Sequence, residues 1–293
     1  MDSFLHDMSW VVPLRSPALT QIFHGLTLLG YMEFFLVLLP VGYWLWDKAL
    51  FTRVAILVGI VGLSNSFLKD LFQDPRPPFA LALDGRVGDS FGLPSGHAQV
   101  AVAMWLWLAY EIKRPWAWIV AVLIAAGVCA SRLYLAVHDI EDVLAGIILG
   151  LASIAVLIVL ISDDFKAWHN LSPAVQLAGI AALAPLMWLI WPRHPLPVSI
   201  YALVAFLFFW WLGRMIEQRA IHYRRHKNWI VAGLATVVGV VVLFGFMWMS
   251  ARPLDVLPKE AALAIQFAVI SLYVTALAPA AFRAIGLADR SAP

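Results

Sequence analysis

The chain has 293 residues, of which 62% are hydrophobic and 13% are charged, and its mean hydropathy is +0.85. A soluble domain carries roughly 25% charged residues, so this composition excludes an ordinary soluble protein. The single cysteine, Cys129, excludes an intramolecular disulfide and a cysteine-based metal cluster, and a formal net charge of +2 identifies no class of partner.

Apolar runs of about 20 residues recur along the chain, each long enough to cross a hydrocarbon layer about 30 Å thick. They predict an all-α, polytopic membrane protein, because a β-barrel would show short alternating segments instead. We expect residues 1–23 to lie at the membrane interface and nine spans to follow. The expected spans are 24–46, 52–71, 95–111, 115–134, 141–161, 174–191, 196–213, 229–250 and 261–282.

Nine spans place the two termini on opposite sides of the membrane. The loops opposite the N-terminus hold 12 of the 20 Lys and Arg residues. These are Lys48, Arg53, Lys113, Arg114, Lys166, Arg214, Arg219, Arg224, Arg225, Lys227, Arg283 and Arg290. Cytoplasmic loops are enriched in Lys and Arg. We therefore expect a bacterial inner-membrane protein with a cytoplasmic C-terminus and an N-terminal side that faces the periplasm or exterior.

Three polar patches fall on the exterior side in this topology. "FLKDLFQDPRPP" closes the second expected span, "PSGHAQ" opens the third, and "SRLYLAVHDIEDVLAG" joins the fourth to the fifth. Residues that are far apart in the sequence are therefore expected at one face of the membrane.

The patches contain groups that bind anions. Lys69, Arg76 and Arg132 are cations near the membrane edge, where an uncompensated charge is costly. Ser95 and Gly96 begin the third span, and a helix N-terminus favours an anion through its free backbone N–H groups. Arginine binds phosphate through a planar fork and lysine binds it as a point charge. Together these residues predict a pocket for a tetrahedral dianion.

Two histidines add chemistry to this pocket. His138 and Asp142 are four residues apart, so on a helix they share a face. A carboxylate that accepts from one ring nitrogen fixes the tautomer and leaves the other nitrogen as a nucleophile. His97 lies beside the predicted phosphate site, where a general acid would act. Since the cations take the role that Mg²⁺ has elsewhere, the pattern predicts catalysis without a metal or cofactor.

Each patch also has a structural interpretation when taken alone. Cations at helix ends snorkel to water, "PSGH" suits a helix cap, and His138 with Asp142 suits an i,i+4 pair; the three together favour the functional interpretation. Asn65, one turn before Lys69, either braces that lysine or makes a polar helix–helix contact. The other acids of this region are expected to be solvated. They are Asp70, Asp74, Asp84, Asp89, Asp139 and Glu141.

The three patches resemble the signature motifs of the type 2 phosphatidic acid phosphatase superfamily, which also contains vanadium haloperoxidases and glucose-6-phosphatase-like enzymes. The matching residues are Lys69-x6-Arg76-Pro77, Pro94-Ser95-Gly96-His97 and Ser131-Arg132-x5-His138-x3-Asp142. The resemblance covers about residues 24–161. It implies a helical-bundle core that hydrolyses phosphate esters through a phosphohistidine without a metal ion.

The resemblance also implies a role for each matching residue. His138 would be the nucleophile, His97 the general acid, and Asp142 the residue that orients His138. The phosphate would be held by Lys69, Arg76, Ser95, Gly96 and Arg132.

The sequence thus predicts three parts: residues 1–23 at the interface, a catalytic core over 24–161, and a membrane extension of four spans over 162–293. The expected substrate is a lipid phosphate or pyrophosphate, such as phosphatidic acid, phosphatidylglycerophosphate or a polyprenyl pyrophosphate. A lipid phosphotransferase, a glucose-6-phosphatase-like sugar phosphatase and a non-enzymatic anion or lipid transporter remain open. The bilayer is the expected partner, nucleic acid is not, and the sequence does not indicate an oligomeric state.

Overall fold

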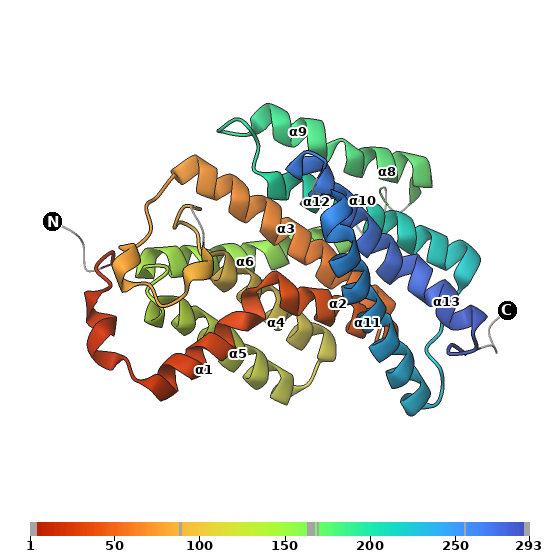
Figure 1. Ribbon diagram of the computed structural model, residues 1–293, viewed down its shortest axis with the longest axis horizontal. Helices are drawn as coiled ribbons and strands as arrows, with labels where there is room; N and C mark the ends of the chain where they lie inside the picture. Colours follow the sequence, from red (N-terminus) through yellow and green to blue (C-terminus); the bar gives the residue numbers. More distant parts are fainter. Residues whose placement is uncertain (1–4, 88–89, 163–167, 169, 255, 290–293) are drawn as a thin grey trace. The chain divides into compact units, whose positions relative to one another are not determined.

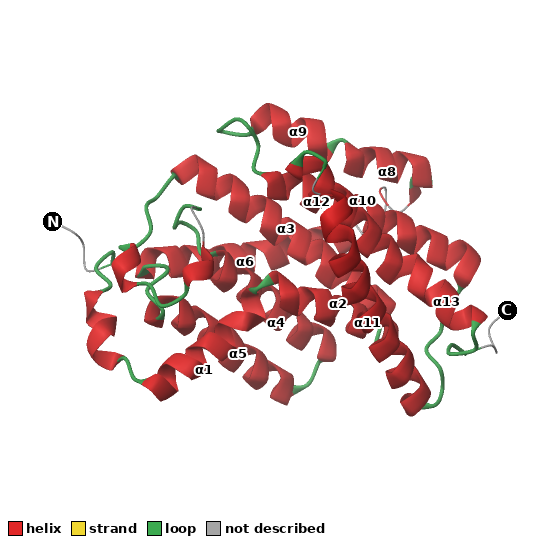
Figure 2. Cartoon of the chain, in the orientation of Figure 1, coloured by secondary structure: helices red, strands yellow, loops and turns green. Residues whose placement is uncertain are grey.

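The structure, a computed structural model, describes residues 5–87, 90–162, 168, 170–254 and 256–289. Its regular elements are helices (Figures 1 and 2). The α-helices are α1 (Pro17–Thr27), α2 (Met32–Leu45), α3 (Lys48–Phe72), α4 (Gly96–Ile112), α5 (Pro115–Tyr134), α6 (Ile140–Ile161), α8 (Pro173–Ala181), α9 (Leu183–Ile190), α10 (Val198–Ile216), α11 (Trp229–Leu254), α12 (Lys259–Leu272) and α13 (Ala278–Ala284). Short 3₁₀ turns cover Ser9–Leu14, Leu28–Gly30, Phe79–Leu81 and Gly85–Val87, and π-helical turns cover Glu217–Ile221 and Tyr273–Leu277.

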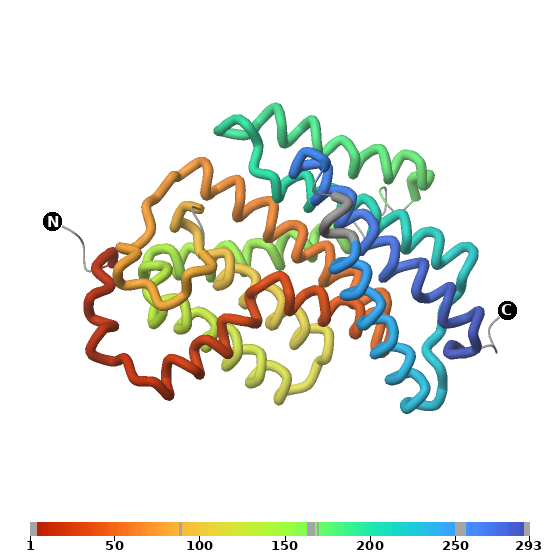
Figure 3. The backbone as a smooth tube through the Cα atoms, viewed as in Figure 1, coloured from red at the N-terminus to blue at the C-terminus, as the bar shows by residue number. Residues whose placement is uncertain are grey.

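The chain forms two compact units, and neither is continuous in sequence. Unit 1 contains residues 1–35, 60–162 and 191–194, and unit 2 contains residues 36–59, 163–190 and 195–293. Helices α2 and α3 each begin in one unit and end in the other, which can be followed along the tube in Figure 3. The expected boundary between a catalytic core and an extension near residue 161 stays a prediction.

The helices confirm a polytopic membrane protein but not the expected number of nine spans. Within the described residues, seven helices are long and apolar enough to cross a membrane, or eight if the bent pair α1 and α2 forms one span. The remaining expected span corresponds to α4, which has 17 residues and is not among them.

The first expected span, 24–46, is not one continuous helix. A helix begins earlier, at Pro17, where Ser16 Oγ accepts from the backbone N–H of Leu19 at 3.3 Å and proline suits the first helical position. The helical conformation is then interrupted at Tyr31, whose backbone is extended, and the helical segments 17–30 and 32–45 meet at an angle of 58°. The sequence did not reveal this bend, because hydropathy measures the length of an apolar run and not its straightness.

Unit 1 is built around α4, which packs against α5 and α6, while α1 packs on α5. Two glycines of α6, Gly146 and Gly150, face α4. A methyl group at Gly146 would lie 2.6 Å from the backbone oxygen of Ser95, and one at Gly150 would lie 2.8 Å from that of Gln99. Small residues allow such a close approach of two backbones, so these glycines set the position of α4 against α6.

Unit 2 is built around α10, which packs along α12 and against α8. At the end of α10 the buried carboxylate of Glu217 lies 2.5 Å from Lys48 Nζ and accepts from the backbone N–H of Tyr223 at 2.7 Å. The indole of Trp44 donates to the backbone oxygen of Val274 at 2.8 Å. Buried polar groups are thereby paired, as a low-dielectric interior requires.

Replacing Gly146 with alanine tests the contact between α4 and α6. Alanine is favoured over glycine within a helix by about 1 kcal/mol, but here its methyl group would collide with backbone, and overpacking costs about 1–3 kcal/mol. We expect Gly146→Ala to lower the thermal unfolding midpoint in detergent. Gly25→Ala in α1, where the space is open, should leave the midpoint unchanged or raise it. Equal midpoints for the two variants would contradict this packing.

Candidate functional site

The predicted site residues all belong to unit 1, at the ends of four helices. Lys69 lies in the last turn of α3 and Arg132 in the last turn of α5. Gly96 begins α4, and Asp142 lies in the first turn of α6. The backbone N–H of Ser95 donates to the backbone oxygen of Asp142 at 2.9 Å, which joins the starts of α4 and α6 directly.

A capping box at the start of α6 fixes the Asp142 carboxylate. Asp139 is the N-cap and accepts from the backbone N–H of Asp142 at 2.9 Å, and Asp142 Oδ2 accepts in return from the N–H of Asp139 at 3.3 Å. The same Oδ2 lies 2.8 Å from His138 Nδ1. The expectation that Asp139 is solvated was wrong: it is 2% exposed, because it satisfies the free N–H groups of a helix start.

The second ring nitrogen of His138 contacts Arg76. Arg76 Nη1 lies 3.0 Å from His138 Nε2 and 2.6 Å from the backbone oxygen of Val137. Because a guanidinium only donates, Nε2 carries the lone pair and the ring proton is on Nδ1, which donates to Asp142. Burial lowers the pKa of His138 well below its usual range, and the positive charges of Arg76, Lys69 and Arg132 lower it further. The ring is therefore neutral, with its free lone pair directed at a cation.

Two of the cations are held by backbone oxygens of one loop. Lys69 Nζ donates to the oxygen of Gly92 at 2.9 Å and to that of Phe91. Arg76 donates through Nε to the backbone oxygen of Ser90 at 2.6 Å and through Nη2 to its hydroxyl at 2.8 Å. Segment 90–92 therefore satisfies both side chains. Burial lowers the pKa of Arg76 to about 10, so this guanidinium remains charged at neutral pH.

Three buried donors of the predicted site have no hydrogen-bond partner among the residues described. They are Ser95 Oγ, His97 Nε2 and Arg132 Nε. Leaving a buried polar group unsatisfied costs about 1–3 kcal/mol, so such groups are rare and require an explanation. Each of these atoms can donate to an oxygen of an anion.

Arg132 and His97 are surrounded by residues that the sequence did not indicate. Arg132 is 1% exposed; its Nη1 donates to Thr27 Oγ1 and lies 3.6 Å from Asp84 Oδ2. Tyr31 donates its hydroxyl to Asp84, and its ring meets the His97 ring edge-on at 4.5 Å between centroids. The expectation that Asp84 is solvated was wrong: it is 4% exposed, because it compensates a buried guanidinium.

Asn65 makes a helix–helix contact and does not bond to Lys69. Its Nδ2 donates to the backbone oxygen of Pro94 at 3.1 Å and to Gln99 Oε1 at 3.0 Å, which ties α3 to the start of α4. Among the other acids, Asp70 accepts from the Trp191 indole at 2.7 Å. Asp74 is half-buried and Glu141 is exposed, while Asp89 lies outside the described residues.

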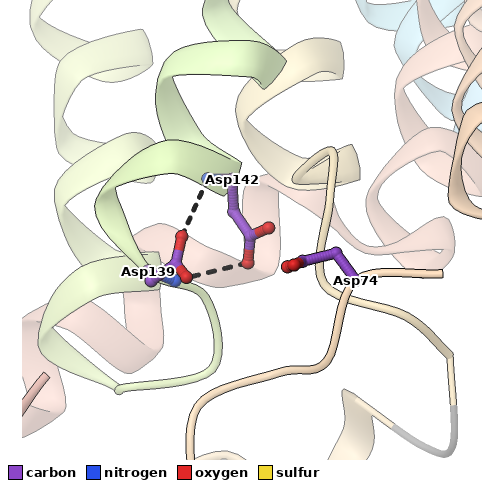
Figure 4. Close-up of side chains that lie close together, drawn as sticks. All are labelled: Asp74, Asp139 and Asp142. Carbon is purple, nitrogen blue, oxygen red and sulfur yellow. Dashed lines mark hydrogen bonds between the residues drawn. The ribbon is translucent and has the colours of Figure 1, made fainter. Parts of the chain in front are cut away.

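Three carboxylates of unit 1 lie close together (Figure 4). Asp74, Asp139 and Asp142 each offer an oxygen, and these oxygens lie within 4.8 Å of one another. However, Asp142 Oδ2 and both oxygens of Asp139 already have nitrogen partners in the protein. We therefore assign no metal ion to this cluster, and the expectation of a metal-free site stays a prediction.

The N-terminal segment is attached to this cluster. His6 Nδ1 lies 2.7 Å from Asp139 Oδ2, and His6 Nε2 lies 3.2 Å from Glu141 Oε2. The backbone N–H of Ile140 donates to the oxygen of Leu5 at 3.1 Å, and the buried side chains of Met8 and Val11 pack with Ala136. Segment 5–14 thus covers the loop that carries His138.

Two family profiles match the chain. The profile described as the PAP2 superfamily matches residues 50–166, and the profile described as the PAP2 superfamily phosphatase, transmembrane extension, matches residues 201–290. The first range contains every predicted site residue.

Curated relatives match up to about half of the chain. Phosphatidylglycerophosphatase B of Bacillus subtilis is 33% identical over 153 residues, which cover 48% of this chain and 74% of the relative. Sphingosine-1-phosphate phosphatase 2 of Mus musculus is 30% identical over 148 residues, which cover 48% of this chain and 40% of the relative. Lipid A 4'-phosphatase of Bacteroides thetaiotaomicron is 34% identical over 116 residues, which cover 36% and 52%.

The chain spans less than half the length of the mouse relative. Among solved structures, the crystal structure of a transmembrane PAP2 type phosphatidylglycerolphosphate phosphatase from Bacillus subtilis is 28% identical. It matches with a TM-score of 0.46 and covers 51% of this chain and 80% of the other.

The contact between His6 and Asp139 should make the docking of segment 5–14 depend on pH. The hydrogen bond to Asp139 raises the pKa of His6; partial burial opposes this, and the charges of Asp139, Glu141 and Asp74 add to it. A raised pKa gives a stabilisation that is complete below the unfolded value of about 6.5 and is lost as pH rises through the folded value. We expect hydrogen exchange in residues 5–14 to accelerate from pH 6 to pH 9, after correction for the intrinsic exchange rate.

The matched control for this prediction is His6→Gln, which keeps a hydrogen-bonding side chain but cannot be protonated. In this variant, the protection of residues 5–14 against hydrogen exchange should not vary over the same pH range. A wild-type segment whose protection is as constant as that of the variant would contradict the prediction.

Proposed function

Because the chain belongs to the PAP2 superfamily, we propose that it is a membrane phosphatase that hydrolyses a lipid phosphate or pyrophosphate without a metal ion. The observation that carries the proposal is the His138 ring, held between the Asp142 carboxylate and the Arg76 guanidinium. Its free Nε2 lone pair is directed at a group that binds phosphate oxygens, which is where a nucleophile would meet a bound phosphoryl group.

In the first step His138 Nε2 attacks phosphorus, and the bond between phosphorus and the leaving oxygen breaks. His97 gives its proton to that oxygen, so the leaving group departs as an alcohol or a phosphate. The ring proton of His138 stays on Nδ1, where Asp142 stabilises the positive charge that develops on the imidazole. The product of this step is a phosphohistidine.

In the second step water attacks the phosphohistidine. His97, now neutral, takes a proton from the water, the bond between Nε2 and phosphorus breaks, and inorganic phosphate leaves. Lys69, Arg76 and Arg132 supply fixed positive charge to the phosphoryl oxygens in both steps, and Ser95 and Gly96 supply the hydroxyl and backbone N–H donors. Fixed charge of this kind is usually the largest contribution to catalysis.

The proposed substrate class rests on where the site lies and on the named relatives. Lys69, Arg132 and Asp142 lie at the ends of α3, α5 and α6, helices that are long and apolar enough to span a bilayer, so a phosphate bound beside them would be at headgroup level. The relatives are named for sphingosine-1-phosphate, phosphatidylglycerophosphate and lipid A. Each of these substrates joins a phosphate to a lipid.

We further propose that the site faces the exterior of a bacterial inner membrane and that the C-terminus is cytoplasmic. The support is the excess of Lys and Arg in the loops at the other ends of the expected spans. Hydrolysis of a membrane-impermeant phosphate ester by sealed right-side-out vesicles would measure this orientation, and hydrolysis by inside-out vesicles alone would contradict it.

Replacing His138 tests the nucleophile. We expect the purified protein to release phosphate from at least one lipid phosphate in EDTA, and His138→Ala to lower the rate by about 10³-fold or more, as removal of a nucleophile does. The panel contains phosphatidic acid, phosphatidylglycerophosphate, a polyprenyl pyrophosphate, a long-chain-base phosphate and glucose-6-phosphate. The matched control is His226→Ala, a histidine of unit 2. Activity that EDTA abolishes, or that survives in His138→Ala, would contradict the mechanism.

Replacing His97 tests the general acid. A general acid contributes about 10²–10⁴-fold, and that contribution is largest for a leaving group that departs poorly as an anion. We therefore expect His97→Ala to slow hydrolysis of an alkyl phosphate by about 10²-fold or more, and hydrolysis of a nitrophenyl phosphate by much less. An equal loss for both esters, measured as kcat/KM, would contradict the role of His97 as general acid.

A further inference from the structure

The break between α1 and α2 brings Tyr31 to the predicted site. Its backbone is extended, with φ −87° and ψ 156°, between a 3₁₀ turn that ends at Gly30 and the start of α2. The side chain has two separate contacts: the hydroxyl donates to Asp84, and the ring meets the His97 imidazole edge-on, with an interplanar angle of 85°. One residue therefore touches both the counterion of Arg132 and the predicted general acid.

His97 is positioned by packing. Its Nε2 has no hydrogen-bond partner among the residues described, so no bond at that atom fixes the ring. Instead the imidazole lies against the backbone of Gly30, so closely that a methyl group there would collide with it, and against the ring of Tyr31. The position of the acidic proton of His97 thus depends on Gly30 and Tyr31.

Arg132 is positioned by a buried carboxylate. Asp84 Oδ2 lies 3.6 Å from Arg132 Nη1, and Asp84 itself is fixed by Tyr31 and by the backbone N–H of Arg86 at 3.1 Å. The Arg86 guanidinium covers the Tyr31 ring at 4.0 Å. The same Nη1 donates to Thr27 Oγ1, so Thr27 and Asp84 together hold one end of the guanidinium, while Nε has no partner among the residues described.

We propose that Tyr31 and Asp84 are positioning residues of the phosphate site: the Asp84 carboxylate aligns the Arg132 guanidinium, and the Tyr31 ring aligns the His97 imidazole. The proposal rests on the proposed function of the same site. It assigns a role to two residues outside the three motifs, and it explains why an apolar helix is interrupted at Tyr31.

The Asp84 contact is tested with two anions of similar charge. Orthophosphate resembles the ground state, and orthovanadate adopts the trigonal bipyramidal geometry of phosphoryl transfer. Loss of the Asp84 charge alone would change the affinity for both anions by the same factor. Misalignment of Arg132 would weaken the vanadate complex more, because the transition-state geometry depends on precise placement of donors. The readout is the ratio of the two dissociation constants, measured by calorimetry on the purified protein.

We expect Asp84→Asn to lower the preference for vanadate by about tenfold, because misplacement of about 1 Å costs up to roughly 10²-fold. Tyr31→Phe, which keeps the ring and loses the bond to Asp84, should lower it in the same direction. A ratio equal to that of the wild type in both variants would overturn the role of Asp84. Since calorimetry needs no turnover, a wild-type protein without phosphatase activity would contradict the proposed function and leave this test intact.

The Tyr31 ring is tested through the leaving group. Tyr31→Leu removes the ring beside His97, so we expect a loss of kcat/KM that is about tenfold larger for an alkyl phosphate than for a nitrophenyl phosphate. Tyr31→Phe should show no such difference. An equal loss for both esters in Tyr31→Leu would overturn the role of the ring. Should Tyr31→Leu not fold, as judged by its thermal midpoint, Tyr31→Trp replaces it, since a larger ring must also displace His97.

The matched controls are Tyr110→Phe and Tyr110→Leu. Tyr110 lies near the far end of α4 and is 52% exposed, so these variants repeat the chemical change away from the site. Both should keep the vanadate preference and the leaving-group dependence of the wild type. A change in either control would assign the effects to general loosening of unit 1, and would overturn the proposal.

Discussion

The structure of unit 1 around the predicted site depends on how three cations close to the hydrocarbon layer are compensated, because an uncompensated charge there is unfavourable in free energy. Lys69, Arg76 and Arg132 lie at or near helix ends and are largely removed from water, where each charge needs a compensating group. The structure uses a different solution for each: loop carbonyls for Lys69, carbonyls and a ring nitrogen for Arg76, and the Asp84 carboxylate for Arg132. The loops around the site, and the interruption between α1 and α2, bring these partners next to the cations.

The start of α6 shows how one local element serves both folding and the site. Asp139 caps the helix, and the reciprocal bond from its N–H holds Asp142, which in turn bonds to His138. Nδ1 of His138 is thereby committed, and Nε2 is left for Arg76. The tautomer of the predicted nucleophile is therefore a consequence of helix capping, and a change of the cap would be transmitted to the ring through two hydrogen bonds.

The motif residues could be predicted from the sequence because each interrupts an apolar run at a fixed spacing. The all-α membrane fold could be predicted because apolar runs of about 20 residues are a clear signal of membrane-spanning helices. It could not predict the contact between Asp84 and Arg132, since a loop acid reveals nothing of a partner on a distant helix. Tyr31 was missed for a different reason: it lies inside a continuous apolar run, and only the His97 ring packed against Gly30 and Tyr31 shows why the helix bends there. The expected number of nine spans was not confirmed for another reason: α4 has 17 residues and is not among the described helices that are long and apolar enough to cross a membrane.

The carbonyl groups that hold Lys69 and Arg76 also affect how tightly the proposed site would bind a phosphate. Most donors of Lys69 and Arg76 already bond to segment 90–92, Val137 or His138. The free energy that an entering anion gains from these two cations is therefore largely a difference between two bonded states. Ser95 Oγ, His97 Nε2 and Arg132 Nε have no bonds to lose among the residues described, and any bond they form is a full gain. We therefore expect the affinity for the anion to come more from these unpaired donors than from the charges of Lys69 and Arg76. The larger contribution of Lys69 and Arg76 is expected in the transition state. There, negative charge shifts onto the phosphoryl oxygens, a change that the backbone carbonyl groups cannot reproduce.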